Sequence, residues 1–100
     1  MPSLTVSVSH QLSEQEAAQR LKERYEAAKK VYGGHVSDFE EQWNDRGLHC
    51  RFRAYGMKFA GQVESHPGEV QVRLDLPLLA MAFKGKIEQA VRQELGAALS

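Results

Sequence analysis

The sequence predicts an α+β domain in two layers, an antiparallel β-sheet with two helices packed on one face, in the order β-α-β-β-β-β-α. Three observations predict this class: an alternating segment near the start, two amphipathic helical segments, and a long central region with a period of two. The helices have one apolar side each and the sheet has one apolar face, so stacking them buries both. The 100 residues form a single domain, 1–100, without repeats or linkers.

The first strand and the first helix are marked by alternation and by a capping box. Apolar side chains alternate with small polar ones from Leu4 to Ser9, which is typical of a half-buried strand. Ser13 followed by Glu16 predicts a helix start, because the serine hydroxyl accepts an early backbone hydrogen bond. Gly33-Gly34 predicts the helix end through a left-handed cap. The apolar side of this helix comprises Ala17, Ala18, Leu21, Tyr25, Ala28 and Tyr32.

Residues 48–76 show the clearest alternation in the chain. A tight turn at Tyr55-Gly56 keeps the apolar side chains on one face, with Phe52 opposite Phe59. A second turn at His66-Pro67-Gly68 leads into another alternating strand. The pattern predicts an antiparallel meander with one buried and one wet face.

The segment 36–43 is less regular, because Phe39 and Trp43 share a strand face with Glu41. We expect an edge strand with a bulge near Glu40 or Glu41. An exposed first or second strand could pair between chains, which leaves a homodimer open.

The chain closes with an apolar run, a basic break and a helix. The run Leu76 to Phe83 ends in Lys84-Gly85-Lys86. Pro77 permits a helical turn whereas Gly85 weakens one, so the start of the last helix stays open. Its apolar stripe comprises Phe83, Ile87, Ala90, Val91, Leu95, Ala98 and Leu99.

Composition and charge exclude several classes of protein. Thirteen acidic and thirteen basic residues give zero net charge, which removes the electrostatic signature of a nucleic-acid binder. The single Cys50 excludes an internal disulfide, and the first residues are typical of a strand rather than a signal peptide. The run Leu76 to Phe83 is too short to span a bilayer, so no transmembrane segment is predicted. We therefore expect a cytoplasmic protein.

No catalytic, cofactor or metal residues are predicted. Cys50 lies next to His49, but neighbours on a strand point to opposite faces, so a core cysteine is favoured over a nucleophile. The glycine pair follows the first helix, whereas a phosphate-binding loop precedes a helix, so no phosphate loop is predicted. The four histidines, in four segments, lack metal-ligand spacing: His10, His35, His49 and His66.

Two surfaces are candidate binding sites, each with a structural alternative. The main candidate is an amphiphilic surface, apolar with a basic rim, comprising Leu78, Leu79, Met81, Lys84 and Lys86. Packing of its apolar members in the core is favoured, because so small a domain needs its large side chains there. The secondary candidate is the basic sheet face, comprising Arg51, Arg53, Lys58 and Arg73. There Arg53 faces Lys58, and a solvated face compensated by Glu64 and Asp75 is favoured over an anionic partner.

Four stretches resemble one family along essentially the whole chain. They are Met1-Pro-Ser-Leu-Thr-Val, His10-x-Leu-x-x-x-Glu-Ala, Trp43 before Leu48-x-x-x-Phe-x-x-x-Gly56, and Phe83-Lys-Gly-Lys-Ile-Glu. The chain resembles the polyhydroxyalkanoic acid system proteins, small bacterial proteins whose genes lie near those of polyester storage. Ala82 stands where the family pattern often has a proline, which leaves the helix start less sharply fixed. The family has no established catalytic residues, so the resemblance implies only a cytoplasmic setting tied to polyhydroxyalkanoate granules.

The leading hypothesis is a non-enzymatic accessory protein that binds the polyhydroxyalkanoate granule surface or a granule-associated protein. It depends on the family resemblance and on the amphiphilic surface around Lys84 and Lys86. The alternative is a small-ligand or acyl-chain binding module between sheet and helices, which the short chain disfavours because a large cavity needs more residues around it. An esterase-like or thiol activity at Cys50 ranks third, and nucleic-acid binding through the arginine face ranks last.

Overall fold

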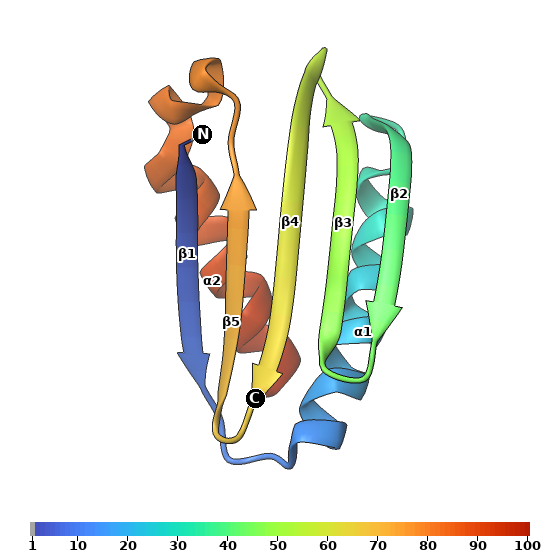
Figure 1. Ribbon diagram of the computed structural model, residues 1–100, viewed down its shortest axis with the longest axis vertical. Coiled ribbons are helices and arrows are strands. Elements are labelled where there is room, and N and C mark those ends of the chain that lie inside the picture. Colours follow the sequence, from blue (N-terminus) through green and yellow to red (C-terminus); the bar gives the residue numbers. More distant parts are fainter. Residues whose placement is uncertain (1) are drawn as a thin grey trace.

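The computed structural model describes residues 2–100, apart from the side chain of Tyr32, and contains a five-stranded antiparallel sheet with two α-helices on one face (Figure 1). The predicted fold class and element order are confirmed. The elements are β1 (Ser3–Ser9), α1 (Glu14–Tyr32), β2 (Val36–Asn44), β3 (Gly47–Ala54), β4 (Met57–His66), β5 (Glu69–Asp75), the 3₁₀ helix η1 (Leu78–Phe83) and α2 (Lys84–Leu99).

The strands follow the order β1-β5-β4-β3-β2, so β1 and β2 are the sheet edges, as expected. Short turns join β2 to β5 in sequence, and β1 lies antiparallel beside β5. The predicted register of the β3–β4 hairpin is confirmed, with Phe52 opposite Phe59. Tyr55 (φ 53°) and Gly56 (φ 75°) both have positive φ, as the tight hairpin turn of type I′ requires.

The expected bulge in β2 lies slightly earlier than predicted. The register with β3 shifts between Ser37 and Glu40, and Asp38 has a φ of 55°. Aspartate is one of the few residues that tolerate this left-handed conformation. The carboxylate of Asp38 lies 3.7 Å from Nε of Arg53, so the bulge also supplies this arginine with a counter-charge.

Helix α1 begins as predicted and ends differently. The Ser13 hydroxyl accepts a hydrogen bond of 3.1 Å from the Glu16 backbone N–H. The left-handed cap at the C-terminus was wrong, because Gly33 has right-handed helical angles (φ −59°, ψ −24°). Glycine is needed at this position because the backbone passes close to the preceding helical turn. A Cβ on Gly33 would lie 2.7 Å from the Lys29 carbonyl oxygen. The predicted place of the Tyr32 side chain on the apolar side lies outside the described residues.

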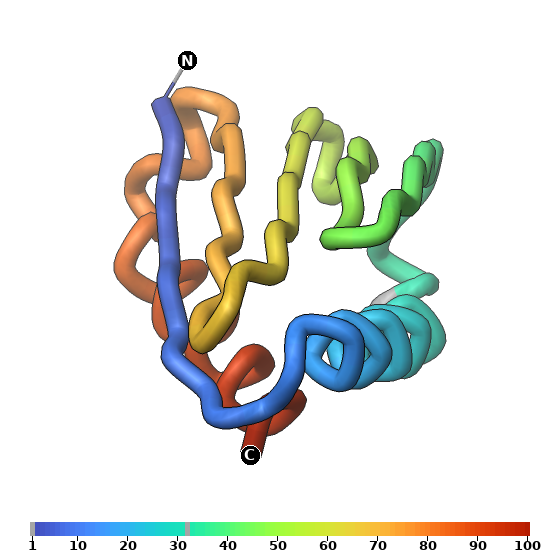
Figure 2. Tube along the Cα trace, turned by 60° about the horizontal axis from the view of Figure 1, so that its bottom comes forward, coloured from blue at the N-terminus to red at the C-terminus, as the bar shows by residue number. Residues whose placement is uncertain are grey.

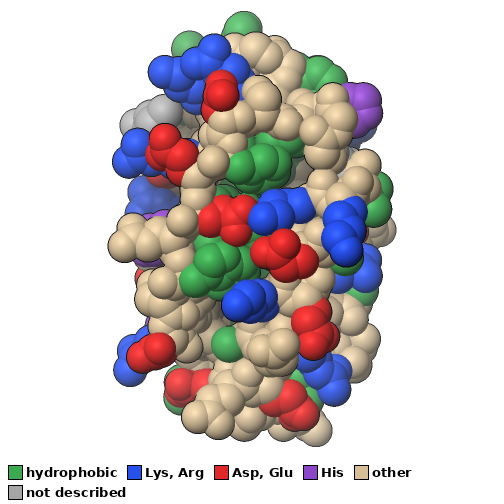
Figure 3. Space-filling model, turned by 90° about the vertical axis from the view of Figure 1, so that its right-hand side faces the viewer, with side chains coloured by type: hydrophobic (Ala, Val, Ile, Leu, Met, Phe, Trp, Pro, Cys, Tyr) green, Lys and Arg blue, Asp and Glu red, His purple; other side chains and the backbone are tan. Residues whose placement is uncertain are grey.

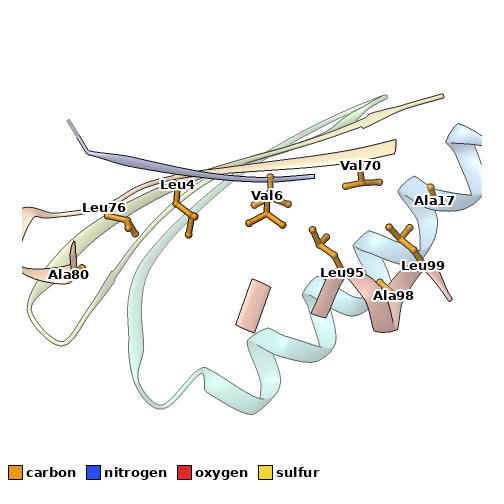
Figure 4. Close-up of a cluster of buried hydrophobic side chains, with 10 residues drawn as sticks. Leu4, Val6, Ala17, Val70, Leu76, Ala80, Leu95, Ala98 and Leu99 are labelled. Carbon is orange, nitrogen blue, oxygen red and sulfur yellow. The ribbon is translucent and has the colours of Figure 1, made fainter. Parts of the chain in front are cut away.

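The cluster of buried hydrophobic side chains is formed mainly by β1, β5 and α2 (Figure 4). Both helices lie on the same face of the sheet, with α2 behind β1 and β5 and α1 behind β2 and β3 (Figure 2). The fully buried residue of α1 is the small Ala17, whereas α2 buries Leu95, Ala98 and Leu99. Two members of the predicted α2 stripe, Phe83 and Ala90, are exposed instead.

Candidate functional site

The apolar run at the corner between β5 and α2 divides into buried and exposed side chains. Leu76 and Ala80 are 0% and 2% exposed and complete the core. Leu78 and Leu79 are both 79% exposed. The preference for core packing was therefore wrong for these two leucines. A hydrogen bond from the Ala80 N–H to the Pro77 carbonyl closes the tight first turn of η1. Only one side of this turn contacts the core, and the two leucines lie on the other side.

The exposed leucines are continuous with a basic helix start. Phe83 is 55% exposed, and Lys84 and Lys86 stand in the first turn of α2 without an acidic side chain in that turn. No ion pair within 4.0 Å involves either lysine among residues 2–100. The fifth predicted member of this surface, Met81, is half-buried against the core. We call the exposed set the corner patch: Leu78, Leu79, Phe83, Lys84 and Lys86.

A second apolar surface, which we call the inter-helix cleft, lies between α1, α2 and the sheet. It is a groove of about 540 Å³ that is partly open to solvent rather than an enclosed cavity. Leu48 and Val63 contribute from the sheet, and the β2–β3 turn also lines the cleft. The helices contribute larger side chains such as Leu21 and Leu95, together with four short ones that leave part of the space open: Ala18, Ala28, Ala90 and Ala98.

Polar contacts hold the two helices together beside the inter-helix cleft. Nε of Arg24 lies 2.5 Å from a carboxylate oxygen of Glu94, which joins α1 to α2. Arg20 donates a hydrogen bond of 2.7 Å to the Ser100 carbonyl. A third cation, Lys22, lies 5.5 Å from the centroid of the Trp43 ring. Within residues 2–100 this lysine has no carboxylate partner within 4.0 Å.

A polar cluster borders the inter-helix cleft between α1 and β2. Nζ of Lys29 donates to Glu41 at 2.5 Å, and Nε1 of Trp43 donates to the same carboxylate at 3.0 Å. The Tyr25 and Trp43 rings meet edge to face, with centroids 5.5 Å apart. Glu41 thus occupies a helix-facing position of β2 because Lys29 and Trp43 satisfy its charge.

The pKa values of Glu41 and Lys29 reflect these contacts. Burial acts to raise the pKa of Glu41, but the hydrogen bonds from Lys29 and Trp43 and the lysine charge outweigh it, so the pKa lies below its ordinary value. The hydrogen bond to Glu41 raises the pKa of Lys29 despite its desolvation. A depressed carboxyl pKa stabilises the fold above the unfolded pKa, and this contribution is lost as pH falls through the folded pKa.

Replacing Glu41 by glutamine is expected to lower the free energy of unfolding by about 1–2 kcal/mol near neutral pH, because a charge-assisted hydrogen bond is lost. Urea denaturation across the acidic range should show the difference from wild type shrinking as pH falls through the titration of Glu41. Glu40→Gln is the matched control, since Glu40 is exposed and outside this cluster. An equal loss of stability at all pH values would contradict the assignment.

Cys50 lies beside this cluster in the interior, separate from His49. Cys50 is 8% exposed and His49 is exposed, so the two side chains lie on opposite faces, as predicted. Burial raises the pKa of the Cys50 thiol and also that of the Tyr25 hydroxyl. That hydroxyl oxygen is itself buried and has no nitrogen or oxygen partner among residues 2–100. A protonated, enclosed thiol favours the packing role over a nucleophilic one.

The outer sheet face is polar and carries both signs of charge. Arg53 faces Lys58 across the β3–β4 hairpin, as predicted. The counter-charges are Asp38 for Arg53 and Asp75 for Arg73, at 3.7 and 3.6 Å. The other expected acid, Glu64, contacts Gln62 and His66 rather than one of the arginines. Acidic and basic side chains are also interspersed on the β2 side of the molecule (Figure 3).

The predicted basic residues of this outer face do not converge on one point. Arg51 and Arg73 line a polar hollow of about 500 Å³ together with Glu40 and Asp75. Arg53 and Lys58 are not among the residues that line the hollow. Mixed charge on both walls supports the interpretation of a solvated face.

The histidines have separate local surroundings. Nδ1 of His10 accepts from the Leu12 N–H at 3.0 Å, and His35 stacks on Tyr55 with centroids 6.1 Å apart. Across residues 2–100, no group of three or more histidine, cysteine, aspartate or glutamate side chains is arranged to hold a metal ion. In the same part of the chain, no helix has both the length and the apolar character needed to cross a membrane.

The one-sided sheet, its two helices and the two apolar surfaces define a small two-layer α+β domain. The family model described as "Putative polyhydroxyalkanoic acid system protein" matches residues 4–99. The chain belongs to this family, which confirms the resemblance seen in the sequence. None of the curated proteins matches the chain.

Proposed function

We propose that the protein is a non-enzymatic, cytoplasmic accessory of polyhydroxyalkanoate storage that attaches to the granule surface through the corner patch. The observation that carries the proposal is the pair Leu78 and Leu79, each 79% exposed and followed by Phe83 at 55%. Adjacent exposed apolar side chains with a polar rim are typical of interaction surfaces. Family membership supports the choice of the granule as the surface.

The chemistry of the corner patch suits a surface that is apolar below and anionic at its boundary. Full burial of a leucine side chain is worth about 1.5–3 kcal/mol, so two leucines and part of Phe83 supply several kcal/mol. Lys84 and Lys86 add about 1 kcal/mol each near an anionic boundary layer. These contributions favour reversible attachment rather than permanent insertion.

The position of the lysines argues for an external partner. Cations in the first turn of α2 oppose the helix dipole, which disfavours them by about 0.3–1 kcal/mol each. The fold offers Lys84 and Lys86 no carboxylate within 4.0 Å among residues 2–100. An anionic boundary layer would supply the missing counter-charge.

Density-gradient fractionation of polymer-accumulating cells tests the attachment. We expect the protein to sediment with the granules, and Lys84→Glu/Lys86→Glu to reduce the bound fraction at least tenfold at low salt. Lys30→Glu/Lys58→Glu is the matched control, because it makes the same charge change at exposed lysines elsewhere. A protein found entirely in the soluble fraction would contradict the proposal, and equal partition of both double variants would exclude the lysines.

A further inference from the structure

We propose that the inter-helix cleft binds the alkyl chain of a medium-chain carboxylic acid, with the carboxylate beside Lys22. Hydroxyalkanoic acids, the building blocks of polyhydroxyalkanoates, are members of this chemical class. The inference goes beyond granule attachment and uses a different surface. The corner patch lies in η1 and the first turn of α2, whereas the cleft is lined by residues of α2 from Ala90 onward.

The inter-helix cleft has the size and lining of a small-molecule site. Its volume of about 540 Å³ lies within the usual range for ligand pockets, roughly 300–1,000 Å³. Leu21 and Leu48 provide aliphatic surface, and the rings of Tyr25 and Trp43 provide flat apolar faces. Alanines at the facing helix positions leave this surface uncovered by the chain itself.

The residues that line the inter-helix cleft include two bases, Lys22 and Arg24, and two acids, Asp45 and Glu94, so the charge balance alone is neutral and the head group is placed by the pairing of each cation. Two of the nearby cations are already bound within the fold, Arg24 to Glu94 and Arg20 to the Ser100 carbonyl. Lys22 lies over the Trp43 ring and has no carboxylate partner within 4.0 Å in the described chain. A carboxylate next to Lys22 would pair with this ammonium while its alkyl chain enters the apolar lining.

The spacing of the helices favours an alkyl chain over a helix of a partner protein. An α-helix with its side chains is about 10–12 Å across. The Arg24–Glu94 bridge of 2.5 Å holds α1 and α2 in direct contact beside the cleft. A third helix is too wide to enter the space beside this contact, whereas an extended alkyl chain is narrower.

Titration with hexanoate, octanoate, decanoate and dodecanoate below their micelle concentrations tests the proposal. Trp43 is the single tryptophan and lines the cleft, so its fluorescence reports binding directly. Calorimetry supplies Kd values that are independent of the probe. We expect Kd to fall roughly tenfold for each added pair of methylenes until the cleft is filled.

Two variants separate the head-group contact from the chain contact. Lys22→Gln is expected to weaken decanoate binding about fivefold, while Lys30→Gln, on the same helix and outside the cleft, leaves it unchanged. Ala18→Leu is expected to weaken it at least tenfold by filling the cleft. Thermal unfolding of Ala18→Leu should show that the fold is retained.

The same measurements can overturn the proposal. If none of the acids binds, the cleft is not a binding site for them. The same conclusion follows if the acids bind and Ala18→Leu leaves their Kd unchanged. Binding of an amphipathic helical peptide in place of the acids would assign the cleft to a protein partner and reject the acyl ligand. Granule partition is measured separately, so failure here leaves the attachment proposal standing.

Discussion

Replacing Leu78 and Leu79 by serine is expected to lower partition onto isolated granules about a hundredfold or more. Each leucine loses roughly 1.5 kcal/mol or more of burial against the granule, and about 1.4 kcal/mol corresponds to tenfold in affinity. The free energy of unfolding should change little, because both side chains are already 79% exposed in the folded protein. Partition is measured by cosedimentation and stability by urea denaturation.

Val31→Ser is the control for this leucine pair. Val31 is 72% exposed on α1, so the variant removes exposed apolar surface away from the corner patch. It should partition like the wild type. If the leucine variant also partitions like the wild type, the apolar part of the corner patch is not the attachment surface. If both variants lose partition equally, attachment depends on general surface hydrophobicity.

Replacing Gly47 by alanine is expected to lower the free energy of unfolding by about 3 kcal/mol or more, although it adds only one methyl group. A Cβ on Gly47 would lie 1.8 Å from the Val63 carbonyl oxygen. That oxygen is backbone in the adjacent strand β4, so no side chain can move aside to relieve the overlap. Urea denaturation measures the loss.

Gly96→Ala in α2 is the matched glycine control. A Cβ on Gly96 has no heavy atom within 4 Å. Alanine favours a helix over glycine by about 1 kcal/mol, so this variant is expected to be more stable than the wild type. Equal effects of the two glycine substitutions would contradict the steric argument for Gly47.

The sheet was the most predictable part of the molecule. Phe52 and Phe59 pair as predicted because a period-two pattern and a two-residue turn together leave one register that keeps the apolar side chains on one face. The bulge in β2 was predicted near Glu40 or Glu41 and lies slightly earlier, between Ser37 and Glu40, where Asp38 lies near Arg53 of the neighbouring strand. A sequence pattern carries no information about such a contact between strands.

The candidate surfaces were only partly predictable. The basic break at Lys84 and Lys86 was visible in the sequence, but the start of the last helix was left open; the structure begins α2 at Lys84. The exposure of Leu78 and Leu79 was not predictable, since hydrophobicity alone does not show which side of a short 3₁₀ turn meets the core. The inter-helix cleft depends on helix spacing, although the alanines of α1 were a signal of unfilled space.

The pairing of β1 with β5 has a consequence for the order of folding. Leu4 lies opposite Leu74, so the first strand in the sequence pairs with the last one. The hairpins from β2 to β5 close over short turns, whereas β1 must close a loop that includes α1 and three strands. Because local contacts form before distant ones, we expect β1 to dock late. During synthesis β1 is made before β5, so its apolar side chains stay unburied until β5 has formed.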